Sequence, residues 1–450
     1  MNRSAKNKSN CARVDALITP GEFLGAALEV PGDKSISHRV AIFSALAHGT
    51  STVVGFLQSD DCIDTMRALE AMGAESFLND DGDLQISGTG GRFLAPRGEL
   101  DFGNSGTGLR LMAGLLAGQP FNSVLAGDES LCKRPMDRIR VPLEMMGAGF
   151  EFREKEDHAP FEITGGGLSG IEYDLPVASA QVKSSILLAA LFSDGVTVIR
   201  ENRRTRDHTE RLMRVLDVPI RVDGLTVSLE GPGIEGPVVE ATEWYVPGDF
   251  SSAAYWVLSA AARPGSRISI QNVGLNPRRT AFLDVIRRMG ADVKVEVISE
   301  SDVVEPYGDI KVQGTELTGT TVEGDEIPNL IDELPLVAVA GALASGETVI
   351  KNAGELRMKE SDRIKAMVTN LAAAGAEVEE TEDGLRVRGP VRLKKNVKFD
   401  SFKDHRVAMA MAILSIYGDS PMTIKDVAST ETSYPGFWGD LRHRGAAVAF

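Results

Sequence analysis

One pattern recurs six times along the chain and constrains its fold more than any other feature. In each copy, an apolar helix rich in Ala and Leu is predicted to lead through a glycine-containing turn into a short strand such as "VTVIRE" or "ETVIKN". The turns are spaced 69 to 81 residues apart and lie at Gly49, Gly118, Gly195, Gly265, Gly346 and Gly418. A polar loop and a second helix follow each strand. This periodicity predicts a chain built from equivalent α/β units of about 70 residues.

The second helices support the same division. Five of them end near a glycine, and these glycines are Gly73, Gly147, Gly290, Gly375 and Gly445. The remaining one should end near residue 218, where "RVLDVPIRV" contains no glycine.

A repeated tetrapeptide groups the six units into two blocks. "VPGD" begins at Val30 and again at Val246, and three units follow each copy. We therefore expect residues 31–245 to form one domain and residues 21–30 plus 246–450 a second, with residues 1–20 as a disordered tail. A solenoid of stacked repeats without catalytic activity is the alternative, although its loops need not differ in charge as these do.

Composition excludes several functional classes. The chain has 450 residues, 43% of them hydrophobic and 25% charged, as expected for a globular protein of two or three domains. No apolar run approaches the roughly 20 residues of a membrane span, and the basic first residues lack the apolar stretch of a secretion signal. Three cysteines without paired spacing favour a reducing, cytoplasmic location. The net charge of −16 disfavours nucleic-acid binding, and six histidines without ligand spacing predict no metal.

Polar segments at the predicted helix starts are the candidates for chemistry. Helix starts present unpaired N–H groups and a positive dipole end, which suit phosphate and carboxylate groups. Each segment alone is weak: Ser35 and Ser179 could be simple helix caps, and "GNSGTG" matches no phosphate-loop signature. Together they predict a cationic pocket that contains Lys34, Arg39, Lys133, Arg134, Arg206, Lys359, Arg363 and Arg406.

Eight ordered segments carry a family resemblance. They are "PGDKSISHR", "FGNSGTG", "KRPMDR", "ASAQVKS", "TRDHTE", "IDELP", "KESDR" and "DHR". In this order, from about Val30 to Trp438, they resemble the 5-enolpyruvylshikimate-3-phosphate synthase family, in the variety with Ser-Ala-Gln. The resemblance implies an α/β fold of two similar domains, each of three βαβαββ units forming an inside-out α/β barrel, with the active site in the interdomain cleft.

The family's reaction transfers the enolpyruvyl group of phosphoenolpyruvate to the 5-hydroxyl of shikimate-3-phosphate and releases phosphate, without a cofactor. By resemblance, Asp332 takes the hydroxyl proton, and Glu360 with Lys34 protonates the methylene carbon. Shikimate-3-phosphate is matched to Lys34, Ser35, Arg39, Ser179, Ala180, Gln181, Arg206, Asp332 and Lys359. Phosphoenolpyruvate is matched to Lys34, Gly106, Arg134, Gln181, Arg363 and Arg406. Glyphosate is expected as a competing inhibitor, and the protein is expected to be a monomer.

Two points leave alternatives open. Many family members carry a lysine near the C-terminal Phe-Pro, whereas this chain reads "STETSYPGF". Two alternatives are open: Arg134, Arg363 and Arg406 suffice there, or Ser and Thr hydroxyls of the loop contribute. Lys425 is too far back in the sequence to be assigned this role. Cys132 precedes "KRP", and the sister enzyme that acts on UDP-N-acetylglucosamine has a loop cysteine before Arg-Pro. The short loop here and the "KESDR" segment favour reading Cys132 as a small loop residue. An RNA 3′-phosphate cyclase is disfavoured by net charge.

Overall fold

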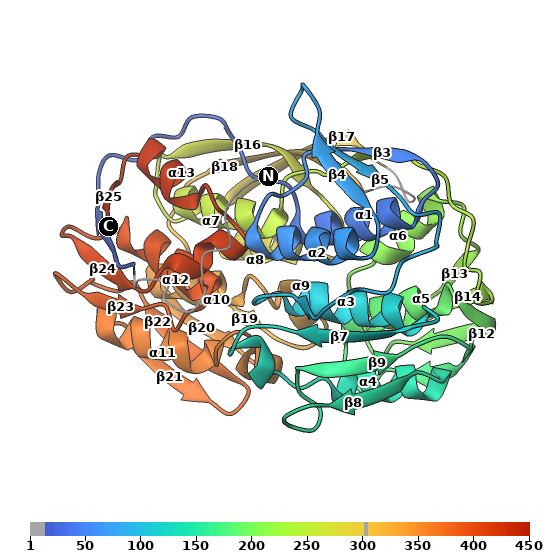
Figure 1. The fold of residues 1–450 in the computed structure, drawn as a ribbon. Coiled ribbons are helices and arrows are strands. Elements are labelled where there is room, and N and C mark those ends of the chain that lie inside the picture. Colours follow the sequence, from blue (N-terminus) through green and yellow to red (C-terminus); the bar gives the residue numbers. More distant parts are fainter. Residues whose placement is uncertain (1–13, 301–304) are drawn as a thin grey trace.

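The computed structural model describes residues 14–300 and 305–450, and it has two hydrophobic cores. One core is built from side chains between Ile36 and Val246. The other is built from Phe250 to Ala446, joined by a few residues near the N-terminus such as Ile18 and Leu28. In Figure 1, the blue-to-green half of the chain and the yellow-to-red half form the two lobes. The predicted two-domain α/β fold is confirmed.

The described residues form six sheets that share one plan, a parallel strand pair extended by an antiparallel pair. Three sheets lie in the first domain: β15 (Glu243–Tyr245), β3 (Thr50–Val54), β5 (Leu84–Ser87) and β4 (Glu75–Leu78); β6 (Leu100–Asp101), β7 (Asn122–Ala126), β9 (Phe161–Thr164) and β8 (Gly149–Phe152); and β10 (Leu168–Ser169), β12 (Ser193–Arg200), β14 (Thr226–Pro232) and β13 (Ile220–Asp223), with β11 (Glu172–Asp174) also on β12. Three lie in the second: β2 (Leu28–Glu29), β16 (Arg267–Gly274), β18 (Tyr307–Gln313) and β17 (Asp292–Ser299); β19 (Thr321–Val322), β20 (Gly346–Ile350), β22 (Gly384–Gly389) and β21 (Glu377–Thr381); and β23 (Lys398–Asp400), β24 (Met422–Lys425), β1 (Ala16–Thr19) and β25 (Ala447–Ala449).

Six helices are buried over nearly their whole circumference, three in each domain. An apolar surface on every side is stable only inside a core, which is why the sheets lie outside these helices (Figure 1). The buried helices are α1 (Lys34–Leu46), α3 (Gly106–Ala117), α5 (Ala180–Ala190), α7 (Phe250–Ala261), α10 (Leu334–Leu343) and α12 (His405–Ser415). The others are α2 (Asp60–Ala71), α4 (Asp137–Met146), α6 (His208–Val215), α8 (Ala281–Arg288), α9 (Ile327–Leu330), α11 (Arg363–Ala374) and α13 (Phe437–His443), with short 3-10 turns η2 (Leu131–Lys133), η3 (Gly324–Glu326), η4 (Gly354–Met358) and η5 (Ala428–Thr432). None of the described helices is long and apolar enough to span a membrane.

The repeated "VPGD" segments lie side by side where the chain crosses between the domains. Gly32 and Gly248 form an antiparallel bridge, and the backbone N–H groups of Asp33 and Asp249 donate to Pro247 and Pro31, at 2.9 and 2.8 Å. Each aspartate then caps the buried helix that follows it. A side chain at Gly32 would lie 1.9 Å from the carbonyl oxygen of Gly55, so glycine permits this close crossing.

The prediction of a disordered tail through residue 20 is wrong for its C-terminal part. Ala16–Thr19 forms β1, which pairs antiparallel with both β24 and β25, and Ala16 and Ile18 are fully buried. In the other five sheets, the corresponding strand follows the sheet's second helix later in the chain, but the sixth unit ends at β25. The N-terminal segment therefore fills the missing position. Residues 1–13 lie outside the described part of the chain.

The unit without its glycine keeps the backbone turn that the glycine provides elsewhere. Gly73, Gly147, Gly290, Gly375 and Gly445 all have φ between 99 and 116°. At the end of α6, Asp217 takes φ 56°, a left-handed conformation that aspartate adopts at a cost and glycine adopts freely.

Candidate active site

A cavity of about 350 Å³ lies between the two domains, and the N-terminal ends of all six buried helices reach it. Its lining includes Lys34 of α1, Gly106 of α3, Gln181 of α5 and Arg406 of α12, together with the cap of α7 and Asp332 just before α10. Helix starts concentrate positive partial charge and unpaired N–H groups in one place. The fold therefore builds an anion-binding cavity from equivalent points of its six units.

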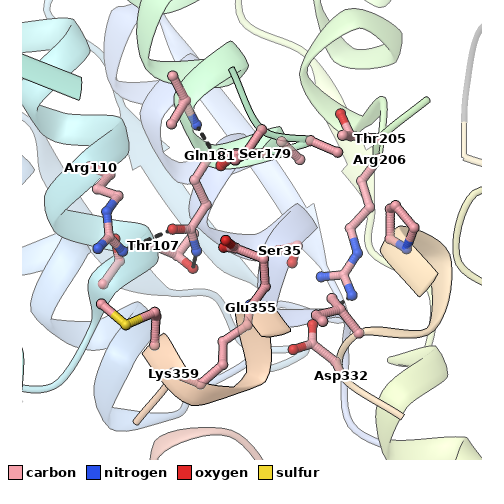
Figure 2. Close-up of a pocket in the computed structure, with 18 of the residues that line it drawn as sticks. Ser35, Thr107, Arg110, Ser179, Gln181, Thr205, Arg206, Asp332, Glu355 and Lys359 are labelled. Atoms are coloured by element: carbon pink, nitrogen blue, oxygen red, sulfur yellow. Dashed lines mark hydrogen bonds and ion pairs between the residues drawn. The ribbon is translucent and has the colours of Figure 1, made fainter. Parts of the chain in front are cut away.

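The side chains around this cavity strengthen its positive charge. Lysine and arginine outnumber carboxylates in the lining: the cations are Lys34, Arg39, Arg110, Arg134, Arg138, Arg203, Arg206, Arg279, Lys359 and Arg406, and the carboxylates are Asp61, Asp249, Asp332, Glu355 and Glu360. Figure 2 shows Lys359 and Asp332 on segments of the second domain, facing Ser179, Gln181 and Arg206 of the first. An acidic protein thus presents a cationic interior to small anionic molecules.

Asp332 lies among arginines of both domains. Its carboxylate oxygens lie 2.5 Å from Arg206 Nη2, 3.4 Å from Arg363 Nη1 and 3.5 Å from Arg406 Nη2. Burial would raise the pKa of Asp332, but the charges of Arg406, Arg206, Lys359 and Arg363 hold it well below its ordinary value. Asp332 is therefore ionised at neutral pH and can accept a proton.

Glu360 has a similar environment. It lies 2.6 Å from Arg363 Nη2 and 3.7 Å from Arg134 Nη1. Burial opposes its ionisation, but Arg363 and Arg134 hold the pKa of Glu360 well below its ordinary value. Glu360 carries a negative charge as long as these arginines have no other anion to bind.

Lys34 pairs with an acidic residue that the sequence reasoning missed. Its Nζ donates to Asp61 Oδ2 at 3.1 Å. Burial would lower the pKa of Lys34, but Asp61 raises it above the ordinary value, so the ammonium is charged. Burial and the neighbouring Lys34 lower the pKa of His405 to about 3, which leaves that imidazole neutral. The acidic start of a predicted second helix, "SDDC", was the available signal for Asp61.

Arg110 is a second residue that was missed. Its Nη1 donates to Gln181 Oε1 at 2.9 Å, and Gln181 Nε2 donates to Thr107 Oγ1 at 3.0 Å (Figure 2). Arg134, one of the predicted ligands, is held by Asn104 Oδ1 at 2.6 Å. Arg110 lies one helical turn after Gly106 in "GTGLR", and this i,i+4 spacing was the signal that could have found it.

The structure brings together all but one of the residues assigned by resemblance. The residues that line the cavity are Lys34, Ser35, Arg39, Gly106, Arg134, Ser179, Ala180, Gln181, Arg206, Asp332, Lys359, Glu360 and Arg406. Arg363 lies behind the wall: its side chain is 1% exposed, and its Nε donates to Asp404 Oδ2 at 2.8 Å. Its guanidinium contacts two residues of the cavity lining, Glu360 and Asp332.

One expectation about a neighbouring loop is wrong, and the structure also bears on an alternative that the sequence left open. Lys133, expected in the cationic pocket, is absent from the cavity lining among the described residues, and its exposed ammonium pairs with Glu129 at 2.6 Å. In "STETSYPGF", which the structure describes completely, no hydroxyl lines the cavity, and neither does Lys425. The arginines supply the positive charge there, and Arg110 adds to it.

Cys132 also lies away from the cavity. It is half-buried, and its Sγ donates to the carbonyl oxygen of Gly127 at 3.4 Å. Burial raises the pKa of its thiol, which keeps the thiol protonated. This placement does not favour the enzyme that acts on UDP-N-acetylglucosamine.

Fold and cavity together define an α/β protein of two three-unit domains with an anion-binding cavity between them. A solved structure of the enolpyruvyl transferase NikO from Streptomyces tendae superposes with a TM-score of 0.77 over 97% of this chain and 99% of that one; at 16% identity it supports the fold alone.

Closer similarities identify the family. The model of EPSP synthase (3-phosphoshikimate 1-carboxyvinyltransferase) matches residues 18–441, so the chain belongs to this family. A 3-phosphoshikimate 1-carboxyvinyltransferase of Akkermansia muciniphila is 48% identical, over 93% of this chain and 97% of that protein. One from Geobacillus kaustophilus is 44% identical, with the same coverage. An EPSP synthase structure from Acinetobacter baumannii, 39% identical, has a TM-score of 0.85 over 98% of this chain and all of that chain.

Proposed function

We propose that this chain transfers the enolpyruvyl group of phosphoenolpyruvate to the 5-hydroxyl of shikimate-3-phosphate, releasing inorganic phosphate. The observation that carries the proposal is the interdomain cavity, in which two ionisable carboxylates, Asp332 and Glu360, lie among arginines and helix starts. Two phosphates and a carboxylate need this positive charge, and two proton transfers need the carboxylates.

Asp332 acts on the hydroxyl in this proposal. Its lowered pKa means that it enters the reaction ionised, ready to accept the 5-hydroxyl proton as the oxygen attacks phosphoenolpyruvate. Arg206 Nη2 lies 2.5 Å from this carboxylate. The substrate's phosphate draws Arg206 and Lys359 toward itself and leaves Asp332 free to act as the base.

Glu360 exchanges a proton with the methylene carbon. Its pKa is held down by Arg363 and Arg134, which are also proposed to bind phosphoenolpyruvate. When the anions of phosphoenolpyruvate take these arginines, Glu360 loses its counter-charges and gains negative neighbours, so its pKa rises. The carboxyl can then hold a proton, give it to the methylene carbon, and take one back when phosphate leaves. Lys34 lies beside it and shares this role.

The remaining ligands divide between the two substrates, and each substrate is held by residues of both domains. Shikimate-3-phosphate contacts Lys34, Ser35, Arg39, Ser179, Ala180, Gln181, Arg206, Asp332 and Lys359, and phosphoenolpyruvate contacts Lys34, Gly106, Arg134, Gln181, Arg363 and Arg406. Glyphosate, which resembles an extended phosphoenolpyruvate, competes for the phosphoenolpyruvate half. We also propose that the protein acts as a monomer.

Phosphate release on mixing substrates tests the assignment. We expect phosphate only when shikimate-3-phosphate and phosphoenolpyruvate are both present. Release with UDP-N-acetylglucosamine in place of shikimate-3-phosphate would overturn the proposal, and no release with either acceptor would leave a non-catalytic scaffold as the better reading.

A further inference from the structure

Three charged side chains lie buried behind the cavity wall of the first domain. Lys183 Nζ lies 2.7 Å from Glu210 Oε1 and 3.0 Å from Glu201 Oε1, and the three side chains are 0%, 1% and 2% exposed. None of them lines the cavity. We call Lys183, Glu201 and Glu210 the buried triad.

Stability gives a poor reason for this cluster. Removing three charges from water is costly, and replacing a buried ion cluster with apolar residues of similar volume is often neutral or stabilising. The triad also carries one more negative charge than positive. The buried triad therefore calls for a functional explanation. Its neighbours are the segments proposed to bind shikimate-3-phosphate.

Each member of the triad holds a different wall segment. Lys183 lies on α5, two residues after Gln181. Glu201 Oε1 accepts from the backbone N–H of Thr205, at 3.1 Å, and from the Thr205 hydroxyl, immediately before Arg206. Glu210 lies on α6 beside Thr209. The ammonium of Lys183 thus ties the helix start of α5 to the segment that precedes Arg206 and to α6, whose Thr209 accepts a hydrogen bond from Arg39 of α1.

Arg39 depends on the same cluster for its charge state and its direction. Arg39 donates to three neutral acceptors among the described residues: Thr209 Oγ1 at 2.7 Å, Ser184 Oγ at 2.8 Å and the carbonyl oxygen of Ser35 at 2.8 Å. Burial lowers the pKa of Arg39 to about 10, and Glu210 opposes this fall more than any other neighbour. Glu210 directly follows Thr209, the acceptor of Arg39, on α6, so this carboxylate is placed to compete with a substrate anion for Arg39, and Lys183 occupies it.

We propose that Lys183 is a positioning residue for shikimate-3-phosphate: by pairing with Glu210 and Glu201 it keeps Arg39 unpaired and the Thr205–Arg206 segment in place for the substrate's anionic group. This inference rests on the proposed assignment of shikimate-3-phosphate to this side of the cavity. Lys183 itself does not touch the substrate.

Two matched variants test the inference. The first carries Lys183→Met and Glu201→Gln, which removes the cation, keeps an acceptor for Thr205 and leaves Glu210 without a partner. The second adds Glu210→Gln and differs from the first by one side-chain group. We expect the first to raise the KM for shikimate-3-phosphate at least about tenfold, while kcat and the KM for phosphoenolpyruvate stay within about threefold. The second should return the KM for shikimate-3-phosphate to within about threefold of the parent.

An exposed control sharpens the result. Lys311→Met, which breaks an exposed pair with Glu296, should change nothing. Equal KM values for the two variants, whether raised or unchanged, would overturn the positioning role. Phosphate release by the parent protein tests the proposed function separately, so failure of one can be told from failure of the other.

Discussion

Gly106→Ala is the substitution whose effect the structure defines most sharply. A Cβ at this position would lie 2.9 Å from Arg110 Nη1 and 3.0 Å from Arg134 Nη1. Ordinary contact begins near 3.4 Å, so each guanidinium must move by about half an ångström. Both are the far ends of flexible side chains, so the protein should fold. The methyl group and the displaced arginines take their room from the phosphoenolpyruvate half of the cavity.

Glyphosate is longer than phosphoenolpyruvate and has less room to shift. We therefore expect the inhibition constant of glyphosate to rise at least about tenfold, which corresponds to a loss of about 1.4 kcal/mol of binding free energy. This lies within the range of about 1–3 kcal/mol that overpacking typically costs. The Michaelis constant for phosphoenolpyruvate should rise less. Steady-state phosphate release, with phosphoenolpyruvate and glyphosate both varied, measures the two constants in one assay.

Gly108→Ala provides the matched control on the same helix. Its Cβ would lie 2.6 Å from Thr65 Oγ1 and 2.9 Å from Ser105 Oγ, away from the cavity lining. Gly108→Ala should lower the free energy of unfolding and leave the ratio of the glyphosate inhibition constant to the phosphoenolpyruvate Michaelis constant unchanged. If Gly106→Ala raises both constants by the same factor, the steric reasoning is wrong. If the parent already resists glyphosate, the proposed competition at this site is wrong.

Four further outcomes follow from the same contacts. Asp332→Asn and Glu360→Gln should each lower kcat by about 100-fold or more with smaller changes in KM, measured by steady-state kinetics. In the folded protein, the pKa values of Asp332 and Glu360 lie well below the ordinary 3.8 and 4.5. The stability that these carboxylates contribute is therefore present at neutral pH and is lost as the pH falls through the lowered values. The urea midpoint of the two variants should therefore fall less steeply with acid than that of the parent. Cys132→Ser should leave kcat within about twofold, and a collapse would revive the sister-enzyme reading. Asp217→Gly should raise the free energy of unfolding by about 1 kcal/mol in urea titrations, since it removes left-handed strain; an unchanged or lower value would contradict this.

The sequence predicted the fold well where the signal was local and repeated. Turn glycines and apolar helices recur because every unit meets the same backbone and packing requirements, so six weak signals reinforce one another. β1 escaped prediction for the opposite reason. Four residues with Ala16 and Ile18 inward give little periodicity, and their partner strands lie more than 400 residues away. The role of the N-terminal segment becomes visible only when the strands of the sixth sheet are compared with those of the other five, because β1 takes the position that a later strand fills in each of them.

The site divides along the same line. Residues at helix starts, such as Lys34 and Gln181, could be predicted because their type departs from the repeat at a known structural position. Asp61 and Arg110 were missed because their local signals do not identify the partner through which each one matters: Lys34 for Asp61, and Gln181 for Arg110. Pairing across helices depends on how the helices pack, and a single sequence does not give the distance between two side chains on different helices.

The ion pairs across the cavity link domain arrangement to proton chemistry. Arg206 meets Asp332, Arg134 meets Glu360, and Arg138 meets Glu355 with two hydrogen bonds of 2.7 and 3.0 Å; each pair joins the first domain to the second. Without substrate, the carboxylates neutralise arginines that would otherwise repel one another across the cleft. On the proposed roles, substrate anions take over this neutralisation at Arg206 and Arg134 and release Asp332 and Glu360. The Arg138–Glu355 pair involves neither proton-transfer carboxylate, so it can persist and hold the domains together while the other two exchange partners.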